Sequence, residues 1–250
     1  MNIFTNQINH LPLDNYKLSV LIPAYNEAAT IYQALVAVAQ VTLPNSGRIE
    51  IILVNDHSTD TTESEVDRFV QQHPEVNVKY LKHATNQGKG ASLHTAILMA
   101  TGDYIIIQDA DLEYDPQEYA LLLSPVLAGK ADVVYGSRFM GDKPHRVLFF
   151  LHTIGNKFLT LLSNLFTNIN LTDMETCYKL FRADLLKNLQ LKEKRFGFEP
   201  EVTAKISKIK RVRINEVGIS YYGRTYAEGK KISWRDGFRA IWCILKYNVI

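Results

Sequence analysis

The 250-residue sequence predicts an α/β fold in which helices cover both faces of a mostly parallel sheet. Two observations support this prediction. Short, almost continuously apolar runs alternate with segments whose apolar residues recur at helical spacing, which is typical of parallel strands buried on both faces. Polar side chains directly follow several of these runs, at the strand ends where such sheets bind ligands.

The first half of the chain contains four predicted strands, at residues 17–23, 49–54, 76–81 and 103–109. Each run is rich in apolar residues, and Pro23 stops the first one. Helices are predicted between the strands. The first begins near Glu27, because apolar residues then recur at helical spacing, at Ile31, Leu35 and Val38. Two more are expected, one ending near Gln72 and one over residues 91–100.

The second half predicts a strand at 132–135, a long amphipathic helix over 146–166, a helix over 199–208, an extended segment over 212–222 and a final amphipathic helix from about residue 233. No linker rich in Pro, Gly or Ser interrupts this pattern. We therefore expect one domain over residues 1–232, followed by a C-terminal amphipathic helix over residues 233–250.

Composition limits the cellular setting. The two cysteines, Cys177 and Cys243, lack the spacing of a structural zinc site, and two thiols in a chain this long suit a reducing compartment. The first residues lack the basic and apolar regions of a signal peptide, and no run approaches the ~18 apolar residues that span a bilayer. We expect a cytoplasmic protein whose contact with a membrane, if any, is peripheral.

Charge is distributed unevenly along the chain. The net charge is +2, but residues 205–246 hold 11 Lys and Arg against 3 Asp and Glu, a net of +8 that leaves −6 for the remainder. A basic C-terminal region suits phosphates or an anionic membrane surface. A solvated charged face explains the same pattern, and no feature points to a nucleic-acid partner.

The strongest chemical signal is the pair Asp109 and Asp111 at the end of the fourth strand. In an extended chain these two side chains project to the same side, and like charges this close need a compensating cation. Oxygen ligands favour Mg²⁺ or Mn²⁺, with Glu113 as a third ligand by the same alternation. The alternative is a pair of solvated aspartates in a turn.

Three further motifs follow strands or precede helices. In PAYNE, Tyr25 can stack on a base and Glu27 can accept hydrogen bonds from a nucleoside, although a first-turn helix acid is the alternative. In NDHSTD, Asp56 stands where an acid can meet a base edge or a ribose. In NQGKGAS, Lys89 can approach a phosphate, but a plain helix-entry turn fits as well, and this is not a Walker A loop.

The order of these motifs, ending in GSRF at residues 136–139, resembles the family 2 glycosyltransferases over residues 17–232. More closely, the chain is similar to the polyprenyl-phosphate sugar synthases, such as the dolichyl-phosphate mannose and glucose synthases. The segment at 173–179 departs from the glycine-containing stretch of the mannose synthases. The QxxRW motif of processive synthases is absent.

The resemblance implies a GT-A fold and an inverting hexosyl transfer from a UDP- or GDP-linked sugar to a polyprenyl phosphate. It implies a nucleoside pocket lined by Pro23, Tyr25, Glu27, Val54 and Asp56. It places the metal at Asp109 and Asp111, with the backbone of Ala110 beside the nucleotide and Glu113 as third ligand. Phosphate groups would meet Arg138, Arg224 and Lys230.

Several alternatives stay open. A lipid phosphate needs no deprotonation, whereas the hydroxyl of a soluble saccharide or protein needs a base, for which Asp173 and Glu175 are candidates. His145 and Arg146 can meet an acceptor phosphate. The helices at 146–166 and after 233 can lie on a membrane, or they can form core or a homodimer seam. A non-catalytic nucleotide-sugar-binding subunit is a second class. A sugar-1-phosphate nucleotidyltransferase is a third, but PAYNEAAT is not the Gly-rich loop that normally follows the first strand in that class.

Overall fold

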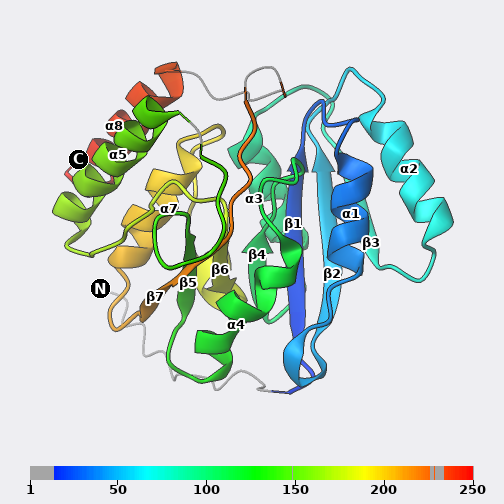
Figure 1. Ribbon diagram of the computed structural model, residues 1–250, viewed down its shortest axis with the longest axis horizontal. Helices are drawn as coiled ribbons and strands as arrows, with labels where there is room; N and C mark the ends of the chain where they lie inside the picture. Colours follow the sequence, from blue (N-terminus) through cyan, green and yellow to red (C-terminus); the bar gives the residue numbers. More distant parts are fainter. Residues whose placement is uncertain (1–13, 148, 226–227, 229–233, 250) are drawn as a thin grey trace.

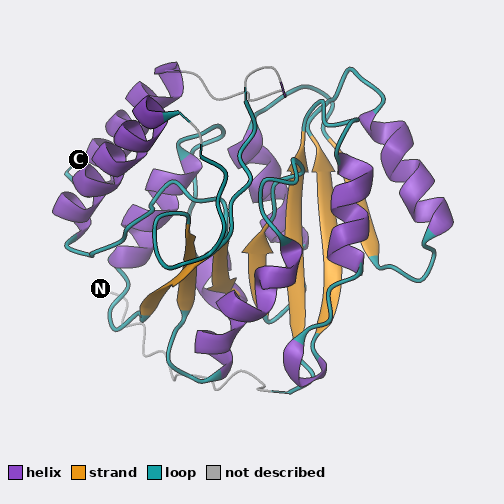
Figure 2. Ribbon diagram, in the orientation of Figure 1, coloured by secondary structure: helices purple, strands orange, loops and turns teal. Residues whose placement is uncertain are grey.

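The computed structural model describes residues 14–147, 149–225, 228 and 234–249. Within these residues the chain forms one seven-stranded sheet in the order β3-β2-β1-β4-β6-β5-β7, with helices packed around it (Figures 1 and 2). The predicted α/β fold with a mostly parallel sheet is therefore confirmed.

The first four strands are parallel and match the predicted apolar runs. They are β1 (Lys17–Ala24), β2 (Arg48–Asn55), β3 (Val78–Lys82) and β4 (Tyr104–Ile107). Val20 in the middle of β1 pairs with Ile51 of β2 on one side and Ile106 of β4 on the other. All three side chains are fully buried, because a central parallel strand is covered on both faces.

The other half of the sheet contains the antiparallel strand that the sequence did not reveal. Strand β6 (Lys179–Arg182) lies antiparallel between β4 and β5 (Val133–Ser137), and β7 (Ile214–Gly218) pairs in parallel with β5. Only four residues long, β6 begins and ends with a basic side chain. Its sequence therefore lacks the continuous apolar run that marks the other buried strands.

The helices are α1 (Ile31–Ala39), α2 (Thr62–Gln72), α3 (Lys89–Met99), α4 (Tyr119–Leu127), α5 (Phe150–Thr167), α6 (Ala183–Lys187), α7 (Phe198–Ser207) and α8 (Trp234–Asn248), with short 3₁₀ turns at Pro44–Ser46 and Pro116–Glu118. Helix α4 was not predicted, because its sequence is apolar almost throughout and contains Pro125. Helix α5 begins at Phe150, four residues later than predicted.

Helix α8 packs against α5 and α7 at one end of the molecule (Figure 1). Its buried residues are Ala240, Cys243 and Ile244, whereas Phe238 and Trp242 are exposed. The predicted apolar stripe is thus only partly directed to the core. The predicted domain boundary at residues 232 and 233 lies outside the described residues, so the division stays a prediction.

None of the helices in the described part of the chain combines the length and the apolarity that crossing a bilayer requires. Cys177 and Cys243 are both buried and unpaired.

A buried carboxylate ties the first strands together at the edge opposite the ligand-binding edge. Glu50 of β2 is 1% exposed and accepts hydrogen bonds from the Ser19 hydroxyl at 2.6 Å and from the backbone and hydroxyl of Thr101 at 2.6 and 2.7 Å. Burial by itself raises the pKa of Glu50, but these hydrogen bonds and the nearby Lys17 outweigh it and lower the pKa to about 2.

We predict that Glu50→Gln lowers the free energy of unfolding by about 1–3 kcal/mol at pH 7, because a buried hydroxyl and amide lose a charged acceptor. The pKa of Glu50 is lower in the folded protein than its ordinary value of 4.5. The stabilisation is therefore complete above about pH 4.5 and is lost as the pH falls towards 2. Urea unfolding from pH 7 to pH 3 should show the difference narrowing. Glu75→Gln, at an exposed side chain, is the control; a pH-independent difference would contradict the prediction.

Candidate active site

A cavity of ≈ 1180 Å³ opens at the carboxyl ends of β1 and β4 and gathers the polar motifs. Of the predicted site residues, it is lined by Pro23, Tyr25, Glu27, Asp56, Lys89, Asp109, Ala110, Asp111, Glu113, Arg138 and Arg224. Val54 is different, because it is fully buried within β2 and lies outside the lining that the described residues form. Lys230 lies outside the described residues.

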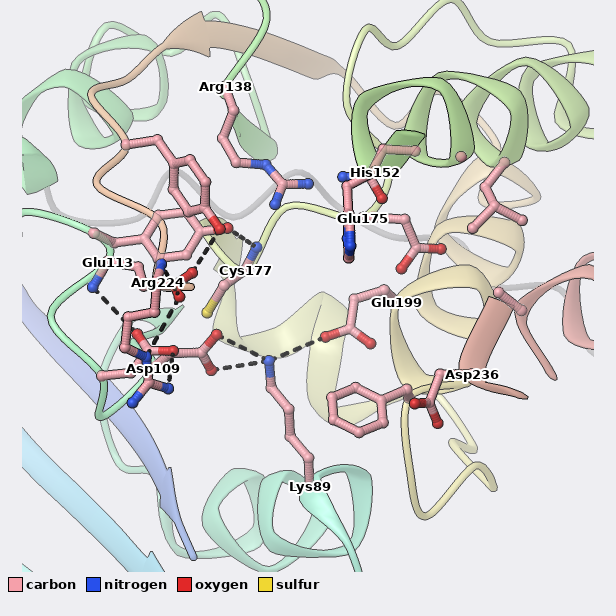
Figure 3. A pocket seen from close by; sticks show the side chains of 18 of the residues that line it. Lys89, Asp109, Glu113, Arg138, His152, Glu175, Cys177, Glu199, Arg224 and Asp236 are labelled. Carbon is pink, nitrogen blue, oxygen red and sulfur yellow. Dashed lines mark hydrogen bonds and ion pairs between the residues drawn. The ribbon is translucent and has the colours of Figure 1, made fainter. Parts of the chain in front are cut away.

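Lys89 at the start of α3 holds the first aspartate. Its ammonium lies 2.8 Å from Asp109 Oδ1 and 3.4 Å from Glu199 Oε1, and Figure 3 shows it pointing between these two carboxylates. Burial raises the pKa of Asp109, but the charge and hydrogen bond of Lys89, together with the Cys177 thiol and the Lys179 charge, outweigh it, so the carboxyl titrates below its usual range. Asp109 is therefore an anion with one fixed cationic partner.

Arg224 joins three carboxylates that are far apart in sequence. Its guanidinium lies 2.9 Å from Asp111 Oδ2 and 3.1 Å from Glu27 Oε2, and its backbone N–H donates to Glu113 Oε1 at 2.8 Å. The Tyr221 hydroxyl donates to the other oxygen of Glu113 at 2.5 Å. Glu113 thus positions the segment that carries Arg224.

The carboxylates at this junction still carry excess negative charge. Burial, followed by the charges of Asp109 and Glu113, raises the pKa of Asp111 to about 7 despite Arg224. Within the described residues, no three acidic, histidine or cysteine side chains are arranged as a ready metal site. The oxygen donors of Asp109 and Asp111 nevertheless suit a divalent cation in chemistry and charge, whereas both Glu113 oxygens already have partners.

Asp56 supports the neighbouring loop. Its carboxylate accepts hydrogen bonds from the backbone N–H of Gln87 at 2.9 Å and of Gly88 at 2.6 Å, and it lies 2.7 Å from His83 Nδ1. It is 3% exposed although it lines the cavity. In this structure Asp56 therefore braces the turn before α3.

The glycines around Lys89 allow close packing of that turn. Gly88 has a φ of +100°, and a Cβ on Gly90 would clash with the backbone carbonyl of Glu193. Both glycines therefore let α3 begin against residues 193–195. This supports the helix-entry interpretation of the motif, while the Lys89 side chain still reaches the cavity.

Arg138 and Asp173 form a buried bidentate pair. The guanidinium Nε and Nη2 lie 2.7 and 2.8 Å from the two Asp173 oxygens, and the Arg138 backbone N–H adds a third bond at 3.0 Å. Burial lowers the pKa of Arg138, but the charge and hydrogen bonds of Asp173, together with the nearby Tyr114 and Tyr221, outweigh it and raise the pKa well above its usual value. Because both its oxygens are engaged, Asp173 is poorly placed to act as a base.

Comparison with known proteins agrees with these motifs. Residues 19–190, more than half of the chain, match the family described as Glycosyl transferase family 2. The chain belongs to glycosyl transferase family 2. The family suggested by the order of the sequence motifs is thereby confirmed.

Two relatives of this family 2 chain are polyprenyl-phosphate sugar transferases by name. A dodecaprenyl-phosphate galacturonate synthase of Rhizobium johnstonii is 27% identical over 221 residues, which are 88% of this chain and 63% of that protein. A dolichyl-phosphate beta-glucosyltransferase of Dictyostelium discoideum is 25% identical over 237 residues, covering 90% of this chain and 71% of that protein. The chain thus spans less than two thirds of the first relative.

A solved structure shares the fold. The glucosyl-3-phosphoglycerate synthase of Mycobacterium tuberculosis, in complex with Mn²⁺, uridine diphosphate and phosphoglyceric acid, matches with a TM-score of 0.71 at 19% identity. The match covers 94% of this chain and 79% of that one. The similarity of fold therefore extends over nearly all of this chain.

Two residues that line this cavity were not predicted from the sequence. Glu199 in the first turn of α7 lines the cavity, but in sequence it is an ordinary helix acid. Tyr221 follows β7 and reaches back to Glu113, a contact between residues 108 positions apart. Neither residue stands in a motif, so pattern and spacing carried no signal for them.

We predict that Asp56→Asn lowers the free energy of unfolding by about 1.5–3 kcal/mol, because an amide cannot accept from all the donors that face this carboxylate. Urea unfolding would measure the loss, with Asp67→Asn on the exposed face of α2 as the matched control. A residue that served only the nucleotide would lose nucleotide affinity and leave the unfolding free energy unchanged, which would refute the structural role.

Proposed function

We propose that this chain is an inverting hexosyltransferase that moves a sugar from a UDP- or GDP-linked donor to a polyprenyl phosphate. One observation carries the proposal: a single cavity joins the Asp109 and Asp111 junction to an exposed apolar helix, α5. The first end suits a diphosphate with its cation and the second suits a lipid. The names of the two relatives support the same class of acceptor.

At the donor end, Asp109 and Asp111 would hold Mg²⁺ or Mn²⁺, and a cation there would neutralise the departing diphosphate. The chain's own groups add to this. Lys89 and Arg224 already lie beside the two aspartates, and as permanent cations they can turn to phosphate oxygens without changing protonation. A third-ligand role for Glu113 would require it to release Tyr221 or the Arg224 backbone.

The nucleoside would lie against Pro23 and Tyr25. Tyr25 lines the cavity and is 38% exposed, and an aromatic ring at this position can stack on a base. Glu27 stands beside it with its carboxylate on Arg224. A ribose hydroxyl arriving here would find an acceptor whose position is already set by an ion pair.

At the acceptor end, the cavity rim combines positive charge with apolar surface. Lys143, His145 and Arg146 line it, as do Phe150 and Leu151 in the first turn of α5. A polyprenyl phosphate pairs an anionic head with an apolar chain, so this rim matches both parts. Arg146 is held by Glu228 at 2.8 Å and is 43% exposed.

Farther along α5 the apolar face remains open. Leu161 is 68% exposed and Leu165 is 74% exposed, and Phe238 of the neighbouring α8 is 65% exposed. Large contiguous apolar patches on a monomer mark interaction sites. We propose that this face lies on the cytoplasmic surface of a membrane and brings the lipid acceptor to the cavity.

A hydroxyl acceptor is the second candidate, and Glu175 favours it. Burial, followed by the charge of Glu199, raises the pKa of Glu175 to about 8, which is near the range that suits a general base. A soluble saccharide or a protein side chain would be the acceptor in that case.

The decisive experiment measures Mn²⁺-dependent sugar transfer from UDP- and GDP-sugars to undecaprenyl phosphate, to soluble saccharides and to water. We expect transfer to the lipid phosphate. Asp111→Asn should reduce turnover roughly 100- to 1,000-fold while the circular dichroism spectrum is retained, because leaving-group stabilisation is lost.

Asp142→Asn, in an exposed loop, is the matched control for that substitution. Full turnover in Asp111→Asn or in excess chelator would contradict the role of the metal. Transfer only to soluble acceptors would establish the second candidate instead.

The membrane proposal predicts that Leu161→Glu reduces binding to vesicles containing anionic lipid by at least about tenfold. The reason is that a leucine side chain buried in the lipid contributes about 1.5–3 kcal/mol to binding. Co-sedimentation measures this, and Leu98→Glu on α3, where the leucine is 83% exposed, is the control. The wild-type protein could instead fail to bind vesicles and form a dimer that Leu161→Glu converts to a monomer. That result would show that the face is a homodimer seam.

A further inference from the structure

Beyond Lys89, the cavity continues to two glutamates that no part of the proposed diphosphate site uses. In Figure 3, Asp109 and Arg224 lie on one side of Lys89, and Glu175 and Glu199 lie on the other. Glu199 comes from the first turn of α7 and Glu175 from the loop that leads into β6. Both line the cavity.

Each glutamate has one buried carboxylate oxygen that forms no hydrogen bond with the described residues. Glu199 is 5% exposed, and its Oε1 faces Lys89 at 3.4 Å. Within the described part of the chain, Glu199 Oε2 and Glu175 Oε1 are buried and have no hydrogen-bond partner. A buried carboxylate oxygen without a partner costs free energy, so such atoms in a cavity point to groups supplied by a ligand.

The neighbouring cations are already engaged. Arg138 is held by both oxygens of Asp173, and Lys89 is shared with Asp109. Lys179 donates to the Thr176 carbonyl and lies over the Tyr135 ring at 5.3 Å. The two glutamates thus add negative charge to this side of the cavity.

The protonation state of Glu175 and Glu199 follows from that arrangement. The raised pKa of Glu175, caused by burial and then by Glu199, means that the pair retains one proton near neutral pH. One carboxyl and one carboxylate offer an O–H donor together with several acceptors. Sugar hydroxyls, which both donate and accept, match that set.

The position of the pair assigns it to the sugar. Lys89 contacts Asp109 and Glu199 at once, so the pair lies one side chain away from the aspartates proposed to hold the diphosphate. In a nucleotide sugar the hexose is attached directly to that diphosphate. A sugar bearing its own carboxylate would add a further negative charge beside the pair, and like charges brought together at a binding site weaken binding.

We propose that Glu175 and Glu199 bind hydroxyl groups of the transferred sugar and thereby select neutral hexoses over uronic acids. The inference rests on the proposed use of a nucleotide-sugar donor. It concerns only the donor sugar and does not depend on the identity of the acceptor.

The test measures binding of matched probes by titration calorimetry in the presence of Mn²⁺. UDP-glucose and UDP-glucuronate form one pair and UDP-galactose and UDP-galacturonate another, each differing only at C6, with GDP-mannose and GDP-mannuronate as the pair for guanine. Free UDP and GDP serve as references. For the wild-type protein we expect the neutral donor to bind at least about tenfold more tightly than its uronate partner.

In the double variant Glu175→Gln/Glu199→Gln the gap should shrink to about threefold or less, because the two amides remove the one negative charge of the pair and keep its shape. Glu199→Gln alone replaces the ionised member and should act in the same direction, and Glu65→Gln on α2 is the control that should leave the gap unchanged. The double variant should bind the free diphosphate as the wild type does.

The outcomes separate this inference from the proposed function. Uronate donors that bind the wild type as tightly as neutral donors, or a gap that survives both glutamine variants, would refute the sugar-binding role. If Glu175 served only as a base for a hydroxyl acceptor, donor binding in the double variant would be unchanged, which would likewise refute the inference. Failure to bind either nucleoside diphosphate would refute the transferase proposal together with this inference.

Discussion

Charge compensation around Asp109 and Asp111 is the constraint on which the site depends. Two carboxylates at the end of one buried strand cannot remain ionised side by side without cations. Lys89 reaches the first from α3 and Arg224 reaches the second from the segment after β7. The site therefore depends on contacts between the start of one helix, the tip of one strand and a segment more than a hundred residues farther along the chain.

The same contacts arrange the cavity into regions of different chemistry. Arg224, held by Glu27 and Glu113, and Lys89 surround the part suited to a diphosphate. Glu175 and Glu199 lie beyond Lys89, and basic and apolar residues before and within the first turn of α5 line a further part of the cavity. The donor and the lipid acceptor that we propose would thus approach the same polar centre from different regions, without competing for the same side chains.

Much of the fold could be predicted because its signals are local. The runs that became β1, β2 and β4 are continuous apolar segments followed by turn residues, and such patterns need no knowledge of neighbours. Strand β6 and helix α4 were missed for opposite reasons: β6 is short and has basic ends, and α4 is too uniformly apolar to show a helical period. Tertiary packing determines both elements.

The site divides in the same way. The sequence alone predicted the α/β class, the family and an acidic pair directly after the fourth strand, because each of these signals lies in residues that are close together along the chain. Tertiary structure decided which cation meets which carboxylate, that Asp56 braces a loop, that Asp173 is committed to Arg138, and that Glu199 faces the cavity. Such pairings depend on distances between residues remote in sequence, which arise only when the sheet and its helices have assembled.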